Sequence, residues 1–203
     1  MTGLSRRMVP AVLAMALSGC ASLLPSGGPP PKLYTLTPAS DFSTHAPPVS
    51  WQLLVDVPAS AAALDTERIA LSRGPTSIDY FADAAWTDRA PLLVQGLLVQ
   101  SFENSGRITA IARESLALRA DYILRTELRH FEADYTGGGA PTAHIQIAAK
   151  LVKMPERVII AQRTVNAAMR ASENQVPAIV AAFNGAGHQA ARQIVDWTLG
   201  AAR

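Results

Sequence analysis

Cysteine is the residue in this sequence whose spacing to its neighbours most directly suggests covalent chemistry. The chain of 203 residues holds one cysteine, Cys20, which follows the small pair Ser18-Gly19. Two arginines, Arg6-Arg7, precede an apolar run from Met8 to Leu17. Charged, apolar and small-residue zones in this order are typical of a secretory signal peptide, here over residues 1–19. The apolar run is too short to cross a bilayer, because a spanning helix needs about 20 apolar residues.

The segment Leu17-Ser18-Gly19-Cys20 resembles a bacterial lipobox. The resemblance implies that Cys20 receives S-diacylglycerol, that the signal is cleaved before it, and that its new amino group is N-acylated. Two or three acyl chains anchor a protein far more firmly than one. Ala21 stands where lipoproteins retained in the inner membrane typically carry Asp, so we expect sorting to the outer membrane, facing the periplasm. The alternative is a free or buried thiol in a soluble protein.

Histidines are the next candidates, because imidazole ligates metals and exchanges protons near neutral pH. Of the four histidines, His130 and His144 form the pair to consider for a metal, since they fall on consecutive predicted strands. Strict alternation places His130 on the inward face with Leu124 and Leu128, and His144 on the wet face next to Ile145. We therefore predict that the two imidazoles point apart and bind no metal.

No catalytic or cofactor-binding constellation is evident in the sequence. Glycines 137–139 lack the Gly-Lys-Ser/Thr ending of a phosphate loop and lie between predicted strands, which indicates a hairpin turn. A Gly-x-Ser-x-Gly elbow and a His-Glu-x-x-His helix are both absent from the sequence. We predict no enzyme activity, no catalytic residue and no cofactor, with an envelope hydrolase as the remote alternative.

The net charge and the cysteine count limit the possible partners of the protein and its sources of stability. The chain has 18 Lys and Arg against 16 Asp and Glu, so removal of the signal with its arginine pair leaves a neutral balance. A neutral chain lacks the basic face that phosphate binding requires, and we predict no nucleic-acid partner. Because no second cysteine is present, the chain has no internal disulfide and depends on packing for stability.

Proline and glycine divide the mature chain into a tether and a folded part. Residues 20–31 comprise the cysteine and a proline-rich and glycine-rich segment that predicts a tether, and we expect residues 32–203 to form a single domain. Five short strands are predicted in its first half, at 32–36, 51–57, 68–71, 76–81 and 108–112. A helix over 89–103, capped by Thr87 or Asp88, is so apolar that it should be buried on more than one side.

The second half of the chain alternates apolar and polar residues with period two. This pattern predicts a meander of three antiparallel strands from Tyr122 onward, in which Arg163 marks a bulge or a strand edge. A final helix over 176–199 contains Gly185 and Gly187, where we expect close packing. The predicted fold is a two-layer α/β (α+β) structure with a mixed, largely antiparallel sheet. Two main helices are expected to cover one face of that sheet.

Several short motifs follow one another along the predicted domain: Leu33-Tyr34-Thr35-Leu36, Val55-Asp56-Val57-Pro58, Leu64 to Arg73, Ile78-Asp79-Tyr80-Phe81, Trp86 to Leu92, and Tyr122-Ile123-Leu124-Arg125 leading to Phe131. Each motif is weak alone, but their order is fairly specific. Together they resemble the ABC-type transport auxiliary lipoproteins, the PqiC-like group associated with Mce-type lipid transport systems. Four residues separate Trp86 from Pro91 here, whereas in some members the proline follows sooner.

The resemblance implies a non-catalytic periplasmic lipoprotein that is anchored in the outer membrane and serves an ABC lipid transporter. Its implied partners are an Mce-domain protein based in the inner membrane and, through the anchor, outer-membrane lipid. Trp86, Arg89 and Pro91 are candidate interface residues, although a tryptophan more often fills the core than an interface. A second hypothesis is a lipid carrier with a cavity beside the 89–103 helix. A homo-oligomer is a further open alternative.

We expect Cys20→Ser to abolish lipid attachment, because serine has no sulfur with which to form the thioether. The mass of the amino-terminal peptide and the partition of the protein into a detergent-rich phase measure the change. Ser22→Ala is the matched control and should leave both unchanged. A Cys20→Ser protein that is still processed, sorted and functional would contradict the proposed anchor.

Overall fold

The computed structural model describes residues 30–42, 48–108, 110–113 and 119–202. Cys20 and Ala21 therefore lie outside the described residues. In chain order the elements are β1 (Lys32–Tyr34), β2 (Leu53–Val55), β3 (Ala59–Ser60), β4 (Arg68–Gly74), β5 (Ser77–Trp86), α1 (Ala90–Asn104), β6 (Ile111–Arg113), β7 (Tyr122–Asp134), β8 (Thr142–Lys153), β9 (Val158–Arg170) and α2 (Val176–Ala201). Each predicted strand and helix overlaps one of these elements, and β3 is the addition.

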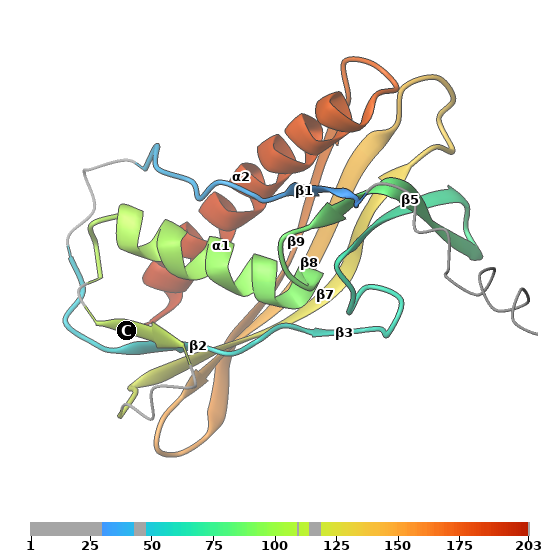
Figure 1. Ribbon diagram of the computed structural model, residues 1–203. Coiled ribbons are helices and arrows are strands. Elements are labelled where there is room, and N and C mark those ends of the chain that lie inside the picture. The colour runs from blue at the N-terminus through green and yellow to red at the C-terminus, as the bar shows by residue number, and fades with distance from the viewer. Residues whose placement is uncertain (1–29, 43–47, 109, 114–118, 203) are drawn as a thin grey trace, which may run out of the picture. The chain divides into compact units, whose positions relative to one another are not determined.

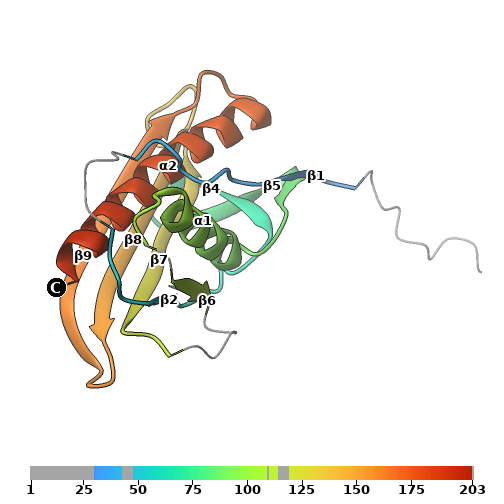
Figure 2. The same ribbon diagram turned by 90° about the vertical axis from the view of Figure 1, so that its left-hand side faces the viewer.

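One mixed sheet forms a layer of the fold, and both helices cover one of its faces (Figures 1 and 2). Within the described chain the sheet has nine strands. β7, β8 and β9 form the predicted antiparallel meander, whereas β2, β3 and β4 pair with β7 in parallel. β4 and β5 form the predicted antiparallel hairpin. The predicted α+β class, with a mixed sheet under two helices, is confirmed.

The inward face of the meander forms the core with the two helices. The alternating residues of β8 on this face are each no more than 1% exposed: Ala143, Ile145, Ile147, Ala149 and Leu151. An aromatic trio of Trp86, Phe131 and Phe183 joins β5, β7 and α2, with ring centroids 5.2–5.4 Å apart. Tilted and edge-on contacts of this kind add stability beyond the area they bury.

The start of α1 differs from its prediction. Arg89 is the N-cap residue and makes no side-chain cap hydrogen bond, so the expected cap by Thr87 or Asp88 is wrong. The Ala90 N–H donates instead to the Thr66 carbonyl, 3.1 Å away, and tertiary structure supplies the partner that a cap side chain would have provided. The expectation that α1 is buried on more than one side is confirmed, because it contacts α2, β2 and β6.

Helix α2 lies close to its neighbours at the two glycines. A Cβ atom added at Gly185 would lie 2.3 Å from Sδ of Met169, and one added at Gly187 would lie 3.4 Å from Leu97. The predicted close packing is confirmed. In β9, the register shift leaves Ile160 as the extra residue. Arg163 pairs with Ala149 and is exposed at the edge of the sheet, so the strand-edge interpretation is the correct one.

We expect Trp86→Ala to lower the free energy of unfolding by about 3–5 kcal/mol, as for other buried aromatics. Trp86 is 1% exposed and contacts Phe131 and Phe183. Trp86→Phe should cost less, because the buried indole N–H has no hydrogen-bond partner among the described residues. Trp197→Ala, at a partly buried tryptophan, is the control. Urea unfolding measures all three, and equal losses for the two alanine variants would contradict the core role of Trp86.

Candidate functional site

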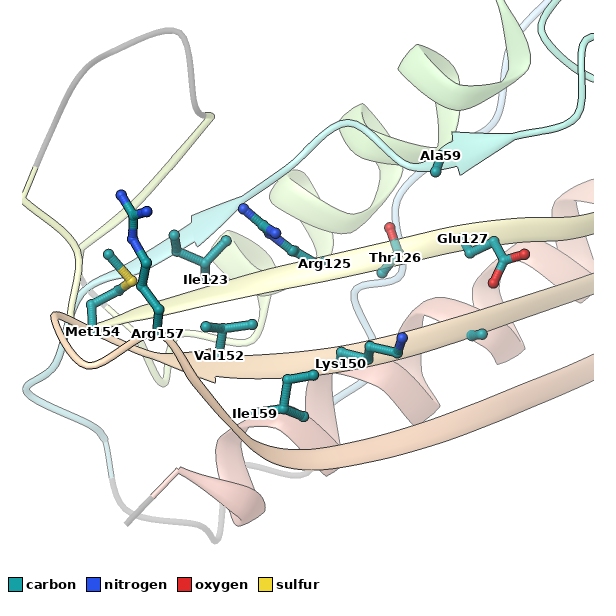
Figure 3. Close-up of a pocket in the computed structure, with 11 residues that line it drawn as sticks. Ala59, Ile123, Arg125, Thr126, Glu127, Lys150, Val152, Met154, Arg157 and Ile159 are labelled. Carbon is teal, nitrogen blue, oxygen red and sulfur yellow. The ribbon is translucent and has the colours of Figure 1, made fainter.

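The face of the meander opposite the helices carries the polar side chains of β7, β8 and β9 and an open groove of about 630 Å³ (Figure 3). The groove lies over these strands at the turn between β8 and β9, and part of its lining is apolar: Ala59, Ile123, Ala148, Val152, Met154 and Ile159. The rest of the lining is Thr126 and four charged side chains, with Arg125, Lys150 and Arg157 against the single acid Glu127. The groove therefore combines apolar surface with an excess of positive charge.

Ion pairing determines which residues carry this excess positive charge. Nε of Arg125 lies 3.1 Å from a carboxylate oxygen of Asp56, which neutralises that guanidinium. Lys150 and Arg157 make no ion pair with any described residue, and both are exposed. Two unpaired cations beside apolar side chains suit a ligand or protein surface that carries acidic groups.

Arg157 has a backbone conformation that an arginine rarely adopts. Its φ angle is +58°, in the left-handed region where the Cβ atom costs an L-residue about 1–2 kcal/mol. Glycine would fit this position without that cost. Arg157 nevertheless lines the groove at the turn between β8 and β9 (Figure 3).

An apolar patch continues from the groove along the start of β9. Val158, Ile159 and Ile160 are 54%, 52% and 39% exposed, and they follow one another on a strand that pairs only with β8 in the described chain. Exposed apolar residues on an unpaired strand edge favour association with another protein. We call the groove and these three residues together the β9 surface.

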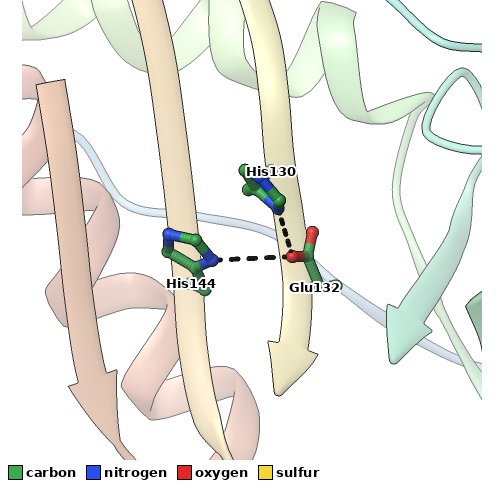
Figure 4. A group of neighbouring side chains, drawn as sticks. All are labelled: His130, Glu132 and His144. Atoms are coloured by element: carbon green, nitrogen blue, oxygen red, sulfur yellow. Dashed lines mark hydrogen bonds and ion pairs between the residues drawn. The ribbon is translucent and has the colours of Figure 1, made fainter. Parts of the chain in front are cut away.

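A histidine cluster occupies the other end of the same sheet face (Figure 4). The pairing of β7 with β8 shifts between Leu128 and His130, so that Arg129 is an extra residue. The shift turns His130 to the outer face, where its ring stacks on that of His144 with centroids 4.5 Å apart. The prediction that His130 and His144 point apart is therefore wrong, because strict alternation does not survive a β-bulge.

Glu132 joins the two imidazoles. Its Oε1 atom lies 2.6 Å from Nδ1 of His130 and 3.6 Å from Nδ1 of His144. Glu132 is the residue paired with His144 across the strands, and it is only 7% exposed. The sequence contained one signal of this arrangement. Two consecutive polar residues, Arg129 and His130, separate the inward residues Leu128 and Phe131, which alternation does not allow.

A hollow of about 540 Å³ lies beside the cluster, between it and the β4–β5 turn. Asp134 and Thr136 also line it. The Thr136 N–H donates to Asp134 Oδ1 over 2.8 Å. This hydrogen bond and one to the Thr136 side chain hold the pKa of Asp134 below its usual 3.8, and the nearby His144 and His130 lower it further.

The residues predicted to form an interface lie elsewhere. Trp86 is 1% exposed and Pro91 is buried within α1, so neither reaches the surface of the described fold. Both side chains fill the core of the described fold, which for Trp86 is the expectation favoured by its residue type, and a contact with a partner stays a prediction. Arg89 is half-exposed, and its guanidinium binds both carboxylate oxygens of Asp65 at 2.9 Å. This ion pair links the start of α1 to the segment before β4.

The sequence model of the ABC-type transport auxiliary lipoprotein component matches residues 34–195. The chain belongs to this family. The resemblance drawn from the short motifs is thereby confirmed, and the matched range contains the β9 surface and the histidine cluster. No helix in the described part of this auxiliary lipoprotein combines the length and apolar character needed to cross a membrane.

Individual proteins resemble this chain in sequence or in fold. A Xanthomonas campestris protein of the family DUF330 has a TM-score of 0.79 and 35% identity, over 84% of this chain and 95% of its own. An uncharacterised protein with 14% identity shares the fold at a TM-score of 0.65, over 83% of this chain and 99% of its own. An uncharacterised Bradyrhizobium diazoefficiens protein is 30% identical over 184 residues, which are 90% of this chain and 49% of that protein. The chain thus spans about half the length of this relative.

We expect Asp134→Asn to lower the free energy of unfolding at neutral pH by less than about 1 kcal/mol, because solvent screens this partly exposed position. A lowered folded pKa means that ionised Asp134 stabilises the fold above the unfolded pKa, and this contribution is lost as the pH falls through the folded pKa. The difference between variant and wild type should shrink below about pH 4. Urea unfolding at a series of pH values tests this. A difference that grows on acidification would contradict it.

Proposed function

We propose that this auxiliary lipoprotein is a non-catalytic subunit of an Mce-type ABC lipid transport system. Its acylated Cys20 holds it in the outer membrane, and its folded domain docks the Mce assembly that projects from the inner membrane. The observation that carries the proposal is the family match over residues 34–195, preceded in the sequence by the lipobox pattern. The tether from Ala21 to Pro31 reaches at most about 35–40 Å when extended, which lets the domain stand away from the lipid headgroups.

The β9 surface is the proposed docking face. It presents the unpaired cations Lys150 and Arg157 next to the exposed apolar residues at the start of β9. Apolar contacts supply binding energy, while charge complementarity selects the partner and its orientation. The proposed complement on the Mce-domain protein is therefore an apolar strip that carries carboxylates.

The lining of the groove supports a non-catalytic role. No serine, cysteine or histidine lines it, so the Ser–His and Cys–His pairs of many hydrolases cannot form there. The packing of α1 favours docking over the alternative of a lipid carrier. Its apolar residues contact α2 and β2, and the buried Gln95 donates through Nε2 to the Val55 carbonyl at 2.9 Å. The apolar surface that suggested a lipid cavity is thus covered by the protein itself.

We expect the full-length lipoprotein, solubilised in detergent, to recover an Mce-domain protein from envelope extracts. Lys150→Glu with Arg157→Glu should reduce recovery at least about tenfold, since the two introduced carboxylates repel the acidic partner. Arg163→Glu is the matched control, because it reverses an exposed charge on β9 at a position paired with the inward residue Ala149. Quantitative mass spectrometry of the eluate measures the partner, a second copy of the chain and bound lipid.

Arg157→Gly separates docking from folding. Glycine relieves the left-handed strain, so this variant should unfold at the same or a higher temperature than wild type while it binds the partner less well. Failure of the wild type to recover an Mce-domain protein, together with unchanged envelope lipid traffic after gene deletion, would overturn the proposal. Recovery of only a second copy through the β9 surface would assign that surface to self-association instead.

A further inference from the structure

We propose that the histidine cluster binds a divalent transition metal ion, zinc, through Nδ1 of His130, Nδ1 of His144 and Oε1 of Glu132. One donor atom from each of the three residues lies within 4.8 Å of the other two (Figure 4). Two imidazole nitrogens and a carboxylate oxygen form a donor set that zinc uses with a fourth position left open. This site is distinct from the β9 surface.

Hydrogen bonding at His144 directs a lone pair toward Glu132. Nε2 of His144 lies 2.8 Å from the Asn166 side-chain oxygen, which can only accept, so Nε2 carries a proton. In the neutral ring Nδ1 then carries none, and its lone pair faces the carboxylate Oε1 at 3.6 Å. Two acceptors in this position repel each other unless a cation lies between them. A proton on Nδ1 of His144 would bridge only that nitrogen and Oε1. A metal ion would bind Oε1 and both Nδ1 atoms together.

The surroundings of Glu132 also favour a cation. This carboxylate is 7% exposed, and buried charges in proteins are normally paired or ligate metals. No lysine or arginine pairs with it among the described residues, since the nearby Arg129 binds Glu127 at 3.0 Å instead. Its other oxygen, Oε2, accepts the Phe131 N–H at 2.7 Å. The carboxylate is therefore held in place with Oε1 directed at the two histidines.

The ligand orientation matches that of known metal sites. A ligating histidine usually donates its second N–H to an oxygen, and a ligating carboxylate is itself hydrogen-bonded. Asn166 and the Phe131 N–H provide these two contacts here. Ligand atoms around a tetrahedral zinc lie about 3.3 Å apart, and the observed separations of 2.6 and 3.6 Å to Oε1 fall on either side of that value. Small side-chain rotations, chiefly of the half-exposed His130, would complete the site.

The hollow of about 540 Å³ next to the cluster gives the open coordination position access to solvent. Nitrogen donors disfavour magnesium and calcium, which prefer oxygen. Zinc at this position would join β7 to β8 on the face opposite the core, and it would stabilise the folded state in proportion to its occupancy.

Titration of the chelator-treated, full-length lipoprotein with zinc tests the site. The protein is kept in detergent and carries no histidine tag. We expect one zinc per chain by calorimetry, a rise in unfolding temperature with zinc, and release of protons at acidic pH as ligands are freed for the metal. His130→Gln, His144→Gln and Glu132→Gln should each weaken affinity at least about a hundredfold, and Asn166→Ala about tenfold to a hundredfold. His188→Gln is the control, since its Nε2 bonds Thr37 on another part of the fold.

Two further measurements distinguish loss of the metal site from loss of the fold. Urea unfolding in chelator shows whether each variant folds, and Cobalt(II) absorption reports a tetrahedral nitrogen and oxygen site in the wild type alone. Wild-type protein that binds no zinc would overturn the proposal and leave the cluster as two stacked histidines, one of them hydrogen-bonded to a carboxylate. Zinc bound equally well by wild type and by the Glu132→Gln and His144→Gln variants would overturn it too. Neither result depends on whether the β9 surface docks a partner.

Discussion

Burial of the inward side chains of β7, β8 and β9 beneath the two helices is the constraint on which the rest of the structure depends. Side chains alternate between the two faces of a strand, so a slip of one residue would expose every core residue of the meander. Burial of Ile145 and Leu151 sets the register of β8. Contacts among the aromatic trio of Trp86, Phe131 and Phe183 hold α2 against β5 and β7. The opposite face is then left to polar side chains.

The bulge at Arg129 changes the chemistry of that opposite face. Leu128 and Phe131 both point inward although they are three residues apart, which an unbroken strand does not permit. The extra residue allows both to reach the core and turns His130 outward. A requirement of packing thus places His130 beside His144, and the same strand contributes the buried Glu132 between them.

The two faces of the sheet present different surfaces. The helices occupy one face and bury the apolar surface of α1 within the protein (Figures 1 and 2). The outer face retains a cationic and apolar groove at one end and the histidine cluster at the other. The unpaired edge of β9 leaves an accessible surface on that outer face, and the proposed docking uses this surface.

The sequence by itself determined the elements, the α+β class and the inward face of β8, because periodicity and turn residues are local signals. It also carried the family motifs. Tertiary structure alone decided the pairing of α1 with the Thr66 carbonyl in place of a cap, the burial of Trp86 and Pro91, and the meeting of His130 with His144. Each of these depends on contacts between segments distant in sequence. Because core packing sets the position of the bulge, strict alternation assigned His130 to the wrong face.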